Sequence, residues 1–235
     1  MNLTKITQEE YAVVEEKETV DLKINNTNKT TVDALLSLCE KWLVDTEKLF
    51  NRYGNQGSEY MYAGARMRIG KSHLSYTVED IHTFSIYFSE LKTHKLFSAC
   101  GQFISALINN HYNKTKTKEI YEIVTSHLNQ KLNFIGQKNN GANITVLGDV
   151  KDHCGLNMKK GTITVQGDCE DLLGVCMKGG RISVENTGIE VGMHMKGGKI
   201  EIRGICKGLS DLILDGLIYH NGKWNHIEHH FSDSY

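Results

Sequence analysis

The spacing of apolar residues changes along the chain from a helical pattern to a pattern of short strands. From Thr31 onward, one helical face is marked at three- and four-residue intervals by Val32, Leu35, Leu36, Cys39, Trp42, Leu43, Leu49 and Phe50. This spacing predicts a helix that ends near Gly54. Before it, an alternating run at 19–24 predicts one strand, and the polar run at 25–31 predicts a linker.

Further helices are predicted between residues 77 and 132. Thr77 followed by Asp80 is a helix-start signal, and the apolar residues after it continue one face to Leu91. The same spacing predicts helices over 96–108 and 120–132, with a basic turn between them. The stretch 55–76 has no helical period, so we expect a hairpin or an extended loop there, with Gly64 and Gly70 at the turns.

The second half contains a glycine-marked repeat of eighteen to twenty residues, between residues 141 and 204. Its strands are marked by the pairs Ile144/Val146, Ile163/Val165, Ile182/Val184 and Ile200/Ile202. Each pair puts two branched side chains on one face of a strand, and stacking such strands about 4.8 Å apart buries them in continuous ladders. A string of hairpins in a barrel or sandwich is the alternative, but every unit recurs in the same sense, which favours a solenoid.

The sequence therefore predicts an α+β protein. Residues 1–30 form an N-terminal strand and linker, 31–134 a mainly α-helical domain, and 135–235 a short right-handed parallel β-helix with a C-terminal cap. Other repeat positions fit this fold: Met158, Met177 and Met195 would form a second ladder, and Gly155, Gly174 and Gly192 recur where the chain should turn with a positive φ.

Two kinds of charged row should lie on the outside of the solenoid. Lys159, Lys178 and Lys196 recur in phase, as do Asp149 with Asp168 and Asp152 with Asp171. Such rows are commonly a solvated face, but stacked lysines repel, and an anionic ligand or partner would relieve that repulsion.

The repeat resembles that of the GXGXG domain, which forms the C-terminal β-helix of the glutamate synthase large subunit and is similar to one of the subunits of formylmethanofuran dehydrogenase. The resemblance covers about residues 135–205 and rests on the G-x-I-x-V-x-G-D and G-x-x-M-K-G-G patterns. The third coil departs from it, because Glu185-Asn186-Thr187 replaces the Gly-Asp turn. In those families the β-helix is a spacer and packing element, so the resemblance implies architecture and a redox or one-carbon partner enzyme, not an activity.

Two motifs suggest chemistry of their own. The string from Ala65 to Ser72 fits a degenerate phosphate loop in which Gly70, Lys71 and Ser72 would bind phosphate, although no buried strand precedes it. In the C-terminal tail, His220, His226, His229 and His230 have a spacing that can capture zinc or nickel; the metal site proper would be His226, His229 and His230. The alternative is a polar terminus after a hairpin at Asn221-Gly222 that caps the solenoid.

Composition narrows the function classes further. Lys and Arg number 27 against 28 for Asp and Glu, so no overall field draws the chain to nucleic acid or to an anionic membrane. The 6 cysteines contain no C-x-x-C pair, and we expect free thiols in a cytoplasmic protein. Cys154 and Cys176, near corners of successive coils, are the candidates for a close pair or a shared metal. No spacing singles out a catalytic triad, and we predict no cofactor. The favoured hypothesis is a non-catalytic scaffold or subunit that binds a protein partner or a second copy through its β-helix.

Overall fold

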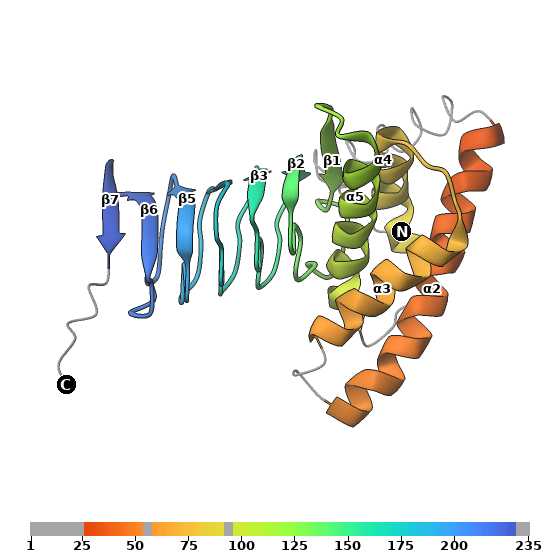
Figure 1. Ribbon diagram of the computed structural model, residues 1–235, viewed down its shortest axis with the longest axis horizontal. Helices are drawn as coiled ribbons and strands as arrows, with labels where there is room; N and C mark the ends of the chain where they lie inside the picture. Colours follow the sequence, from red (N-terminus) through yellow and green to blue (C-terminus); the bar gives the residue numbers. More distant parts are fainter. Residues whose placement is uncertain (1–25, 54–57, 92–95, 229–235) are drawn as a thin grey trace, which may run out of the picture.

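The computed structural model describes residues 26–53, 58–91 and 96–228, and it places four helices at one end of a parallel β-solenoid (Figure 1). The helices are α2 (Asn26–Tyr53), α3 (Ser58–Ser72), α4 (Val78–Ile86) and α5 (Cys100–Thr115), with short 3-10 turns at Tyr87–Glu90 and Phe97–Ala99. The strands are β1 (Ile120–Val124), β2 (Asn140–Leu147), β3 (Lys160–Val165), β4 (Arg181–Val184), β5 (Lys196–Ile202), β6 (Asp215–His220) and β7 (Lys223–Glu228). The α+β architecture with a solenoid is thus confirmed.

The strands form one sheet in chain order, because each coil places its strand beside the strand of the coil before it. Strands β1 to β6 are parallel neighbours, and β7 returns antiparallel to β6. The predicted row Ile144, Ile163, Ile182 and Ile200 crosses the sheet in register and is buried, and Ile218 of β6 extends it by one strand. The β6–β7 turn is the predicted two-residue hairpin, with positive φ at Asn221 and Gly222.

The interior of the solenoid is closed at its corners by glycine. Met158, Met177 and Met195 are fully buried, which confirms the second ladder. Gly155, Gly174 and Gly192 have φ values of 71°, 69° and 73°. A Cβ on Gly155 would overlap Ile182 Cδ1 of the next coil, so the left-handed conformation and the close packing both require glycine here.

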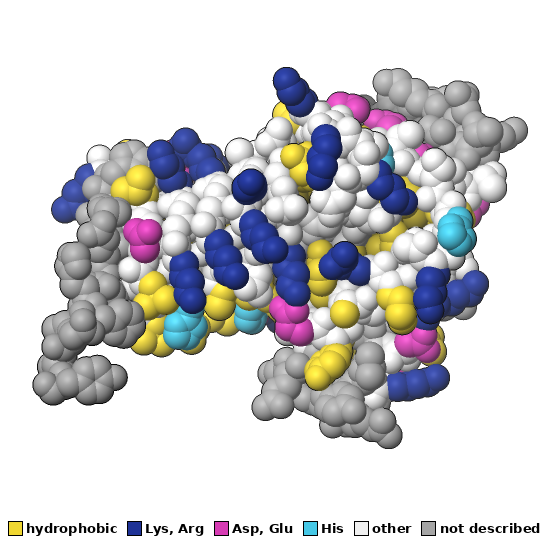
Figure 2. Space-filling model, viewed as in Figure 1, with side chains coloured by type: hydrophobic (Ala, Val, Ile, Leu, Met, Phe, Trp, Pro, Cys, Tyr) yellow, Lys and Arg dark blue, Asp and Glu magenta, His cyan; other side chains and the backbone are white. Residues whose placement is uncertain are grey.

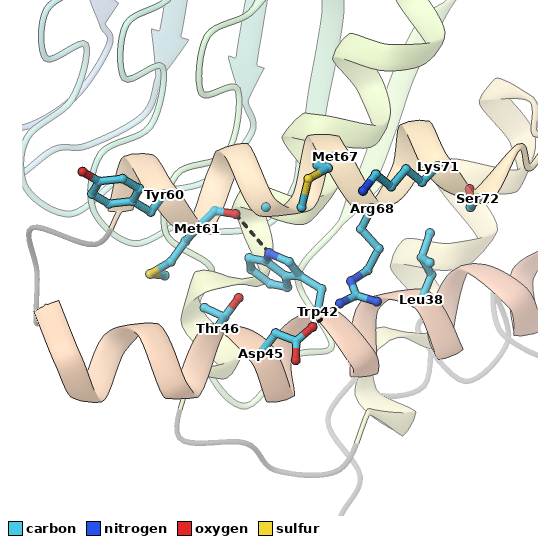
Figure 3. A pocket seen from close by; sticks show the side chains of 11 residues that line it. Leu38, Trp42, Asp45, Thr46, Tyr60, Met61, Met67, Arg68, Lys71 and Ser72 are labelled. Atoms are coloured by element: carbon cyan, nitrogen blue, oxygen red, sulfur yellow. Dashed lines mark hydrogen bonds and ion pairs between the residues drawn. The ribbon is translucent and has the colours of Figure 1, made fainter.

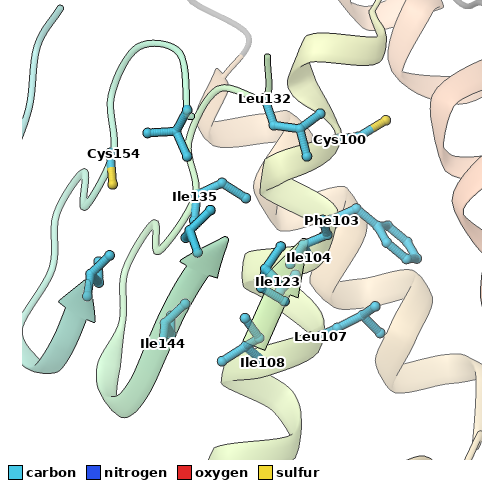
Figure 4. Close-up of a cluster of buried hydrophobic side chains, with 14 of the residues drawn as sticks. Cys100, Phe103, Ile104, Leu107, Ile108, Ile123, Leu132, Ile135, Ile144 and Cys154 are labelled. Carbon is cyan, nitrogen blue, oxygen red and sulfur yellow. The ribbon is translucent and has the colours of Figure 1, made fainter. Parts of the chain in front are cut away.

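The helices and the solenoid share one hydrophobic core. Helix α5 lies between them: Phe103 and Leu107 point towards the other helices, whereas Ile104 and Ile108 point towards the first coils of the solenoid (Figure 4). An amphipathic helix usually buries one stripe, but α5 is buried from Cys100 to Asn109 because it packs on two sides.

Polar side chains of the helices also satisfy the backbone of the first coil. Ser105 Oγ accepts a hydrogen bond from Gly136 N at 2.9 Å, and Asn109 Nδ2 donates to Gln137 O at 2.9 Å. On α4, Ser85 Oγ accepts from Val124 N of the edge strand β1 at 3.0 Å. A solenoid end with unpaired backbone groups invites aggregation, and here the helices cover it.

Three sequence predictions in the helical half are wrong. Residues 58–72 form helix α3 where a hairpin or loop was expected, and α2 already begins at Asn26, within the predicted linker. Residues 120–124 form strand β1 instead of the start of a helix, so the parallel ladder begins at Ile120. The predicted strand at 19–24 lies outside the described residues.

The helix-start signal at Thr77 is confirmed. Its side chain accepts from Asp80 N at 3.1 Å, and the Asp80 carboxylate accepts from Thr77 N at 2.8 Å, which is a complete capping box. Within the described part of the chain, no helix combines the length and apolar character needed to cross a membrane.

Candidate functional site

The predicted phosphate-binding residues lie at the wrong end of a helix for a phosphate loop. Gly70, Lys71 and Ser72 belong to the last turn of α3. Ser72 Oγ donates to Ile69 O at 2.8 Å and accepts from Leu74 N at 3.3 Å, so this hydroxyl finishes the helix. A phosphate loop precedes a helix and offers its backbone N–H groups, whereas a helix C-terminus offers carbonyl oxygens. These three residues therefore do not form a phosphate loop, and phosphate binding by them stays a prediction.

Lys71 and Ser72 nevertheless line a groove between α2 and α3, with a cavity volume of about 440 Å³. Its apolar and aromatic lining residues are Leu38, Trp42, Tyr60, Met61 and Met67, of which Tyr60 and Met67 are the most exposed (Figure 3). The indole N–H of Trp42 donates to Met61 O at 3.0 Å, which joins the two helices below the groove. The sequence gives no sign of this groove, because residues 55–76 lack a helical period and a hairpin or loop was expected there.

The charges of the groove are unequal. Arg68 reaches across it from α3 to form an ion pair with Asp45 on α2 (Figure 3). Lys71 is exposed and forms no ion pair with any residue that the structure describes. Thr46, on α2, is 1 % exposed.

The lysines predicted to stack are exposed on the solenoid. Lys159, Lys178 and Lys196 occupy the same corner of successive coils, since Lys178 N bonds to Met158 O and Lys196 N to Met177 O. Figure 2 shows Lys and Arg side chains in a row along this face of the solenoid. None of the three lysines forms an ion pair within the described ranges, so the row stays open to an anion or to solvent.

The aspartate rows have a structural role that their spacing in the sequence did not predict. Asp149 Oδ1 accepts from Asp168 N at 2.9 Å, and Asp168 Oδ1 accepts from Asn186 N at 3.2 Å and Nδ2 at 2.7 Å. Asn186 Oδ1 then accepts from Ile205 N at 2.7 Å. Each side chain thus closes a turn of the next coil. Asparagine replaces the third aspartate, and its amide satisfies Asp168 where another carboxylate would repel it.

The second aspartate row repeats this arrangement. Asp171 N donates to Asp152 Oδ1 at 3.2 Å, and Ile189 N donates to Asp171 Oδ1 at 2.9 Å. Between the rows, Lys131 Nζ forms ion pairs with Asp149 at 3.2 Å and with Glu170 at 3.3 Å. A cavity of about 480 Å³ on this side is therefore lined by carboxylates already engaged within the fold.

The predicted metal site is not tested by the described part of the chain. His226 lies in β7, opposite Leu217 of β6, and His229 and His230 lie outside the described residues. Among the described residues, no group of three or more His, Cys, Asp or Glu side chains is placed to hold a metal ion.

The buried thiol pair in the solenoid is Cys154 with Cys169. A hydrogen bond with Cys154, followed by burial, raises the pKa of Cys169 well above its usual value. Cys176, the partner suggested from the sequence, is half-buried at a corner with φ 54°. A buried, protonated thiol is a weak nucleophile and a weak metal ligand, so the Cys154–Cys169 pair acts as core packing.

The last coils of the solenoid carry large exposed apolar side chains, which we call the C-terminal apolar patch: Ile189 (49 % exposed), Ile205 (67 %), Leu209 (38 %) and Leu212 (49 %). These residues lie on segments of adjacent coils that bond to one another: Thr187 N donates to Ile205 O at 2.8 Å, Gly208 N to Gly188 O at 3.3 Å and His194 N to Leu212 O at 2.9 Å, and Val191 pairs with Leu209. Figure 2 shows apolar side chains gathered on the solenoid near the end opposite the helices. Clustered exposed apolar side chains commonly mark protein-binding surfaces.

Comparisons of the chain with protein-family profiles, with characterised proteins and with solved structures found no match. The resemblance to the GXGXG β-helix therefore stays a prediction that rests on the residues of the repeat.

Proposed function

We propose that this protein is a non-catalytic scaffold whose solenoid binds a protein partner through the C-terminal apolar patch. The observation that carries the proposal is the patch itself. Its four side chains are between 38 % and 67 % exposed, although the interior rows of the same coils are fully buried. Isolated exposed apolar residues are ordinary, but a group of them on adjacent coils is a favourable binding surface because contact removes apolar area from water.

The difference between the two ends of the solenoid supports this assignment. At the first coil, α4 and α5 cover the edge and bond its backbone through Ser85, Ser105 and Asn109. At the other end, β7 is the last strand of the sheet among the described residues. The end of the solenoid away from the helices therefore has the edge strand β7 and, on its last coils, the C-terminal apolar patch.

The partner is a second copy of this chain or another protein. The resemblance to the GXGXG β-helix, which serves as a spacer in larger enzymes, adds a redox or one-carbon enzyme as the candidate partner class. The choice of a redox or one-carbon enzyme as the partner rests only on the sequence of the repeat.

The test combines light scattering with affinity capture, using Ile205→Glu together with Leu212→Glu and the matched control Val44→Glu. Val44 is 47 % exposed on α2, so the control adds the same charge far from the patch. We expect the wild type and the control to form an oligomer or to retain a defined protein, and the patch variant to lose that association. Association that survives in the patch variant, or a wild-type monomer that captures nothing, would contradict the proposal.

A further inference from the structure

The corner of the solenoid at which β3, β4 and β5 begin is basic. Its three stacked segments, 157–162, 176–181 and 194–199, contain no Asp or Glu, although the whole chain has 28 such residues against 27 Lys and Arg. Their Lys and Arg residues, all of them exposed, are called the basic corner: Lys159, Lys160, Lys178, Arg181, Lys196 and Lys199. A local excess of one charge of this size favours a ligand of the opposite charge.

Three of these residues, Lys159, Lys178 and Lys196, form a row along the solenoid axis, which we call the lysine row. Lys178 N donates at 2.8 Å to Met158 O, directly before Lys159, and Lys196 N donates at 2.7 Å to Met177 O. Stacked coils lie about 4.8 Å apart, so the row extends about 9.6 Å (Figure 2). Because like charges at this spacing repel, the row favours a ligand whose negative charges have the same repeat.

Acidic side chains at the borders of the basic corner are engaged elsewhere or end the row. Glu201 forms an ion pair with Arg181, and Glu59 of α3 forms one with Lys138. Asp215, at the start of β6, lies in register beside the last lysine, so the row has no fourth member. The three lysines of the row form no ion pair with any residue that the structure describes, and their charges therefore remain available to a partner.

The repeat of the lysine row matches that of acidic residues on one face of a helix. Helical residues rise 1.5 Å each, so carboxylates at i, i+3 and i+7 extend about 10.5 Å along the axis. On one face of an extended strand, three successive side chains extend about 13.6 Å. The row of about 9.6 Å is closer to the helical spacing, so an acidic helix lying along the solenoid axis pairs with all three lysines.

The composition of the basic corner is less suited to nucleic acid. Its three segments contain no Phe, Tyr or Trp on which bases could stack. Five of its six charged residues are lysines, and the one arginine is held by Glu201. Lysine pairs with a carboxylate as a point charge and does not need a fixed geometry. The pairs Gly179-Gly180 and Gly197-Gly198 follow two lysines of the row, so a partner helix can lie close to the backbone there.

We infer that the basic corner binds an acidic helix of a partner protein, whose carboxylates at three- and four-residue intervals pair with the lysine row. This inference does not rest on the scaffold proposal, because no residue of the basic corner belongs to the C-terminal apolar patch. Loss of binding at one surface is therefore distinguishable from loss at the other.

The test is a titration of the full chain with labelled probes at low ionic strength, followed by fluorescence anisotropy. Two peptides of about 20 residues of alanine, glutamine and glutamate have the same composition and are long enough to form helices. The first has its glutamates on one face at three- and four-residue intervals, and the second has them spread around the helix. We expect the first to bind about fourfold more tightly, because it forms two more exposed ion pairs, each worth a factor of about two. Added salt should weaken this binding.

Variants of the lysine row assign the contact. The test variant combines Lys159→Gln, Lys178→Gln and Lys196→Gln, and it should bind the one-face peptide about eightfold more weakly through the loss of three ion pairs. The corresponding triple arginine variant keeps the charges and should keep the binding. Circular dichroism of each variant would verify that the fold is intact.

The matched control combines Lys114→Gln, Lys116→Gln and Lys118→Gln, which removes the same charge from exposed positions at and after the end of α5. It should change peptide binding by less than about twofold, within the effect of a single exposed ion pair. Polyuridylate is the third probe and should bind more weakly than the one-face peptide. No binding of that peptide, equal binding of the two peptides, an equal loss in the control, or tighter binding of polyuridylate would overturn the inference.

Discussion

The contact of Ser105 with the first coil allows a quantitative test of how the helices cap the solenoid. Ser105 is 1 % exposed, and its Oγ is the acceptor for the buried Gly136 N–H at 2.9 Å. The same Oγ lies 2.7 Å from Gly101 O and 2.9 Å from Phe134 O, to which its single proton can donate. Replacing Ser105 by alanine removes all these contacts and almost no volume.

The expected loss follows from which groups are left without a partner. Phe134 O still accepts from Gln137 N at 3.1 Å, so this carbonyl stays satisfied in the variant. Gly136 N loses its acceptor inside the core. An unsatisfied buried donor costs about 1 to 3 kcal/mol, so we expect Ser105→Ala to lower the free energy of unfolding by about 2 kcal/mol.

Urea denaturation followed by circular dichroism and tryptophan fluorescence would measure this loss. Trp42 reports from the helices and Trp224 from β7, so coincident transitions would also show that one core unfolds as a unit. The matched control is Ser75→Ala, since Ser75 is exposed, and it should change stability by less than about 0.5 kcal/mol. A loss for Ser105→Ala as small as that of the control would refute the assigned role of the hydroxyl.

Other parts of the fold give predictions of known sign. Gly155→Ala should lower the free energy of unfolding by about 2 kcal/mol or more, because φ is 71° and the new Cβ overlaps the next coil. Gly70→Ala, in an open part of α3, should raise the free energy of unfolding by about 0.5 kcal/mol. Calorimetry would measure both changes, and equal effects of the two substitutions would contradict the role given to backbone strain. Thr77→Ala should cost about 1 kcal/mol by loss of the capping box, measured by urea denaturation, and an unchanged midpoint would contradict it. Burial lowers the pKa of His111 and of His153, so these histidines bind more protons in the unfolded chain than in the folded protein. Their contribution to the free energy of unfolding should therefore be fully present above about pH 6.5 and be lost as the pH drops below that value. Replacing both histidines by glutamine should flatten that part of the pH profile, and an unchanged slope would be evidence against this linkage.

The solenoid could be predicted from the sequence because its interactions repeat locally. Every coil places an isoleucine such as Ile163 or Ile182 at the same position, and the partner of each is the same residue type one repeat away. Corner glycines such as Gly174 and the capping box at Thr77 depend on backbone conformations that a few neighbouring residues set. Local rules therefore suffice for these features.

Tertiary contacts decided the elements that the sequence analysis assigned wrongly. Ile120 and Val124 have the spacing of a helical face, but the segment is a strand because β2 offers it a parallel partner, which buries Tyr121 and Ile123 and leaves Ile120 53 % exposed. The glycines of α3 suggested turns in isolation, yet packing against α2 and α5 keeps the segment helical.

The groove between α2 and α3 and the C-terminal apolar patch show the same division between local pattern and tertiary structure. Lys71 attracted notice in the sequence as part of a phosphate loop, and only the packing of α3 on α2 makes it part of the lining of a groove. Ile205 and Leu212 have no marked spacing in the sequence, and the stacking of the last coils places them beside Thr187 and His194 of the preceding coil. The sequence by itself determined how the repeated coils stack, because each contact there joins equivalent residues of adjacent repeats. The tertiary structure alone decided which unlike segments meet, because those contacts join residues that share no pattern along the chain.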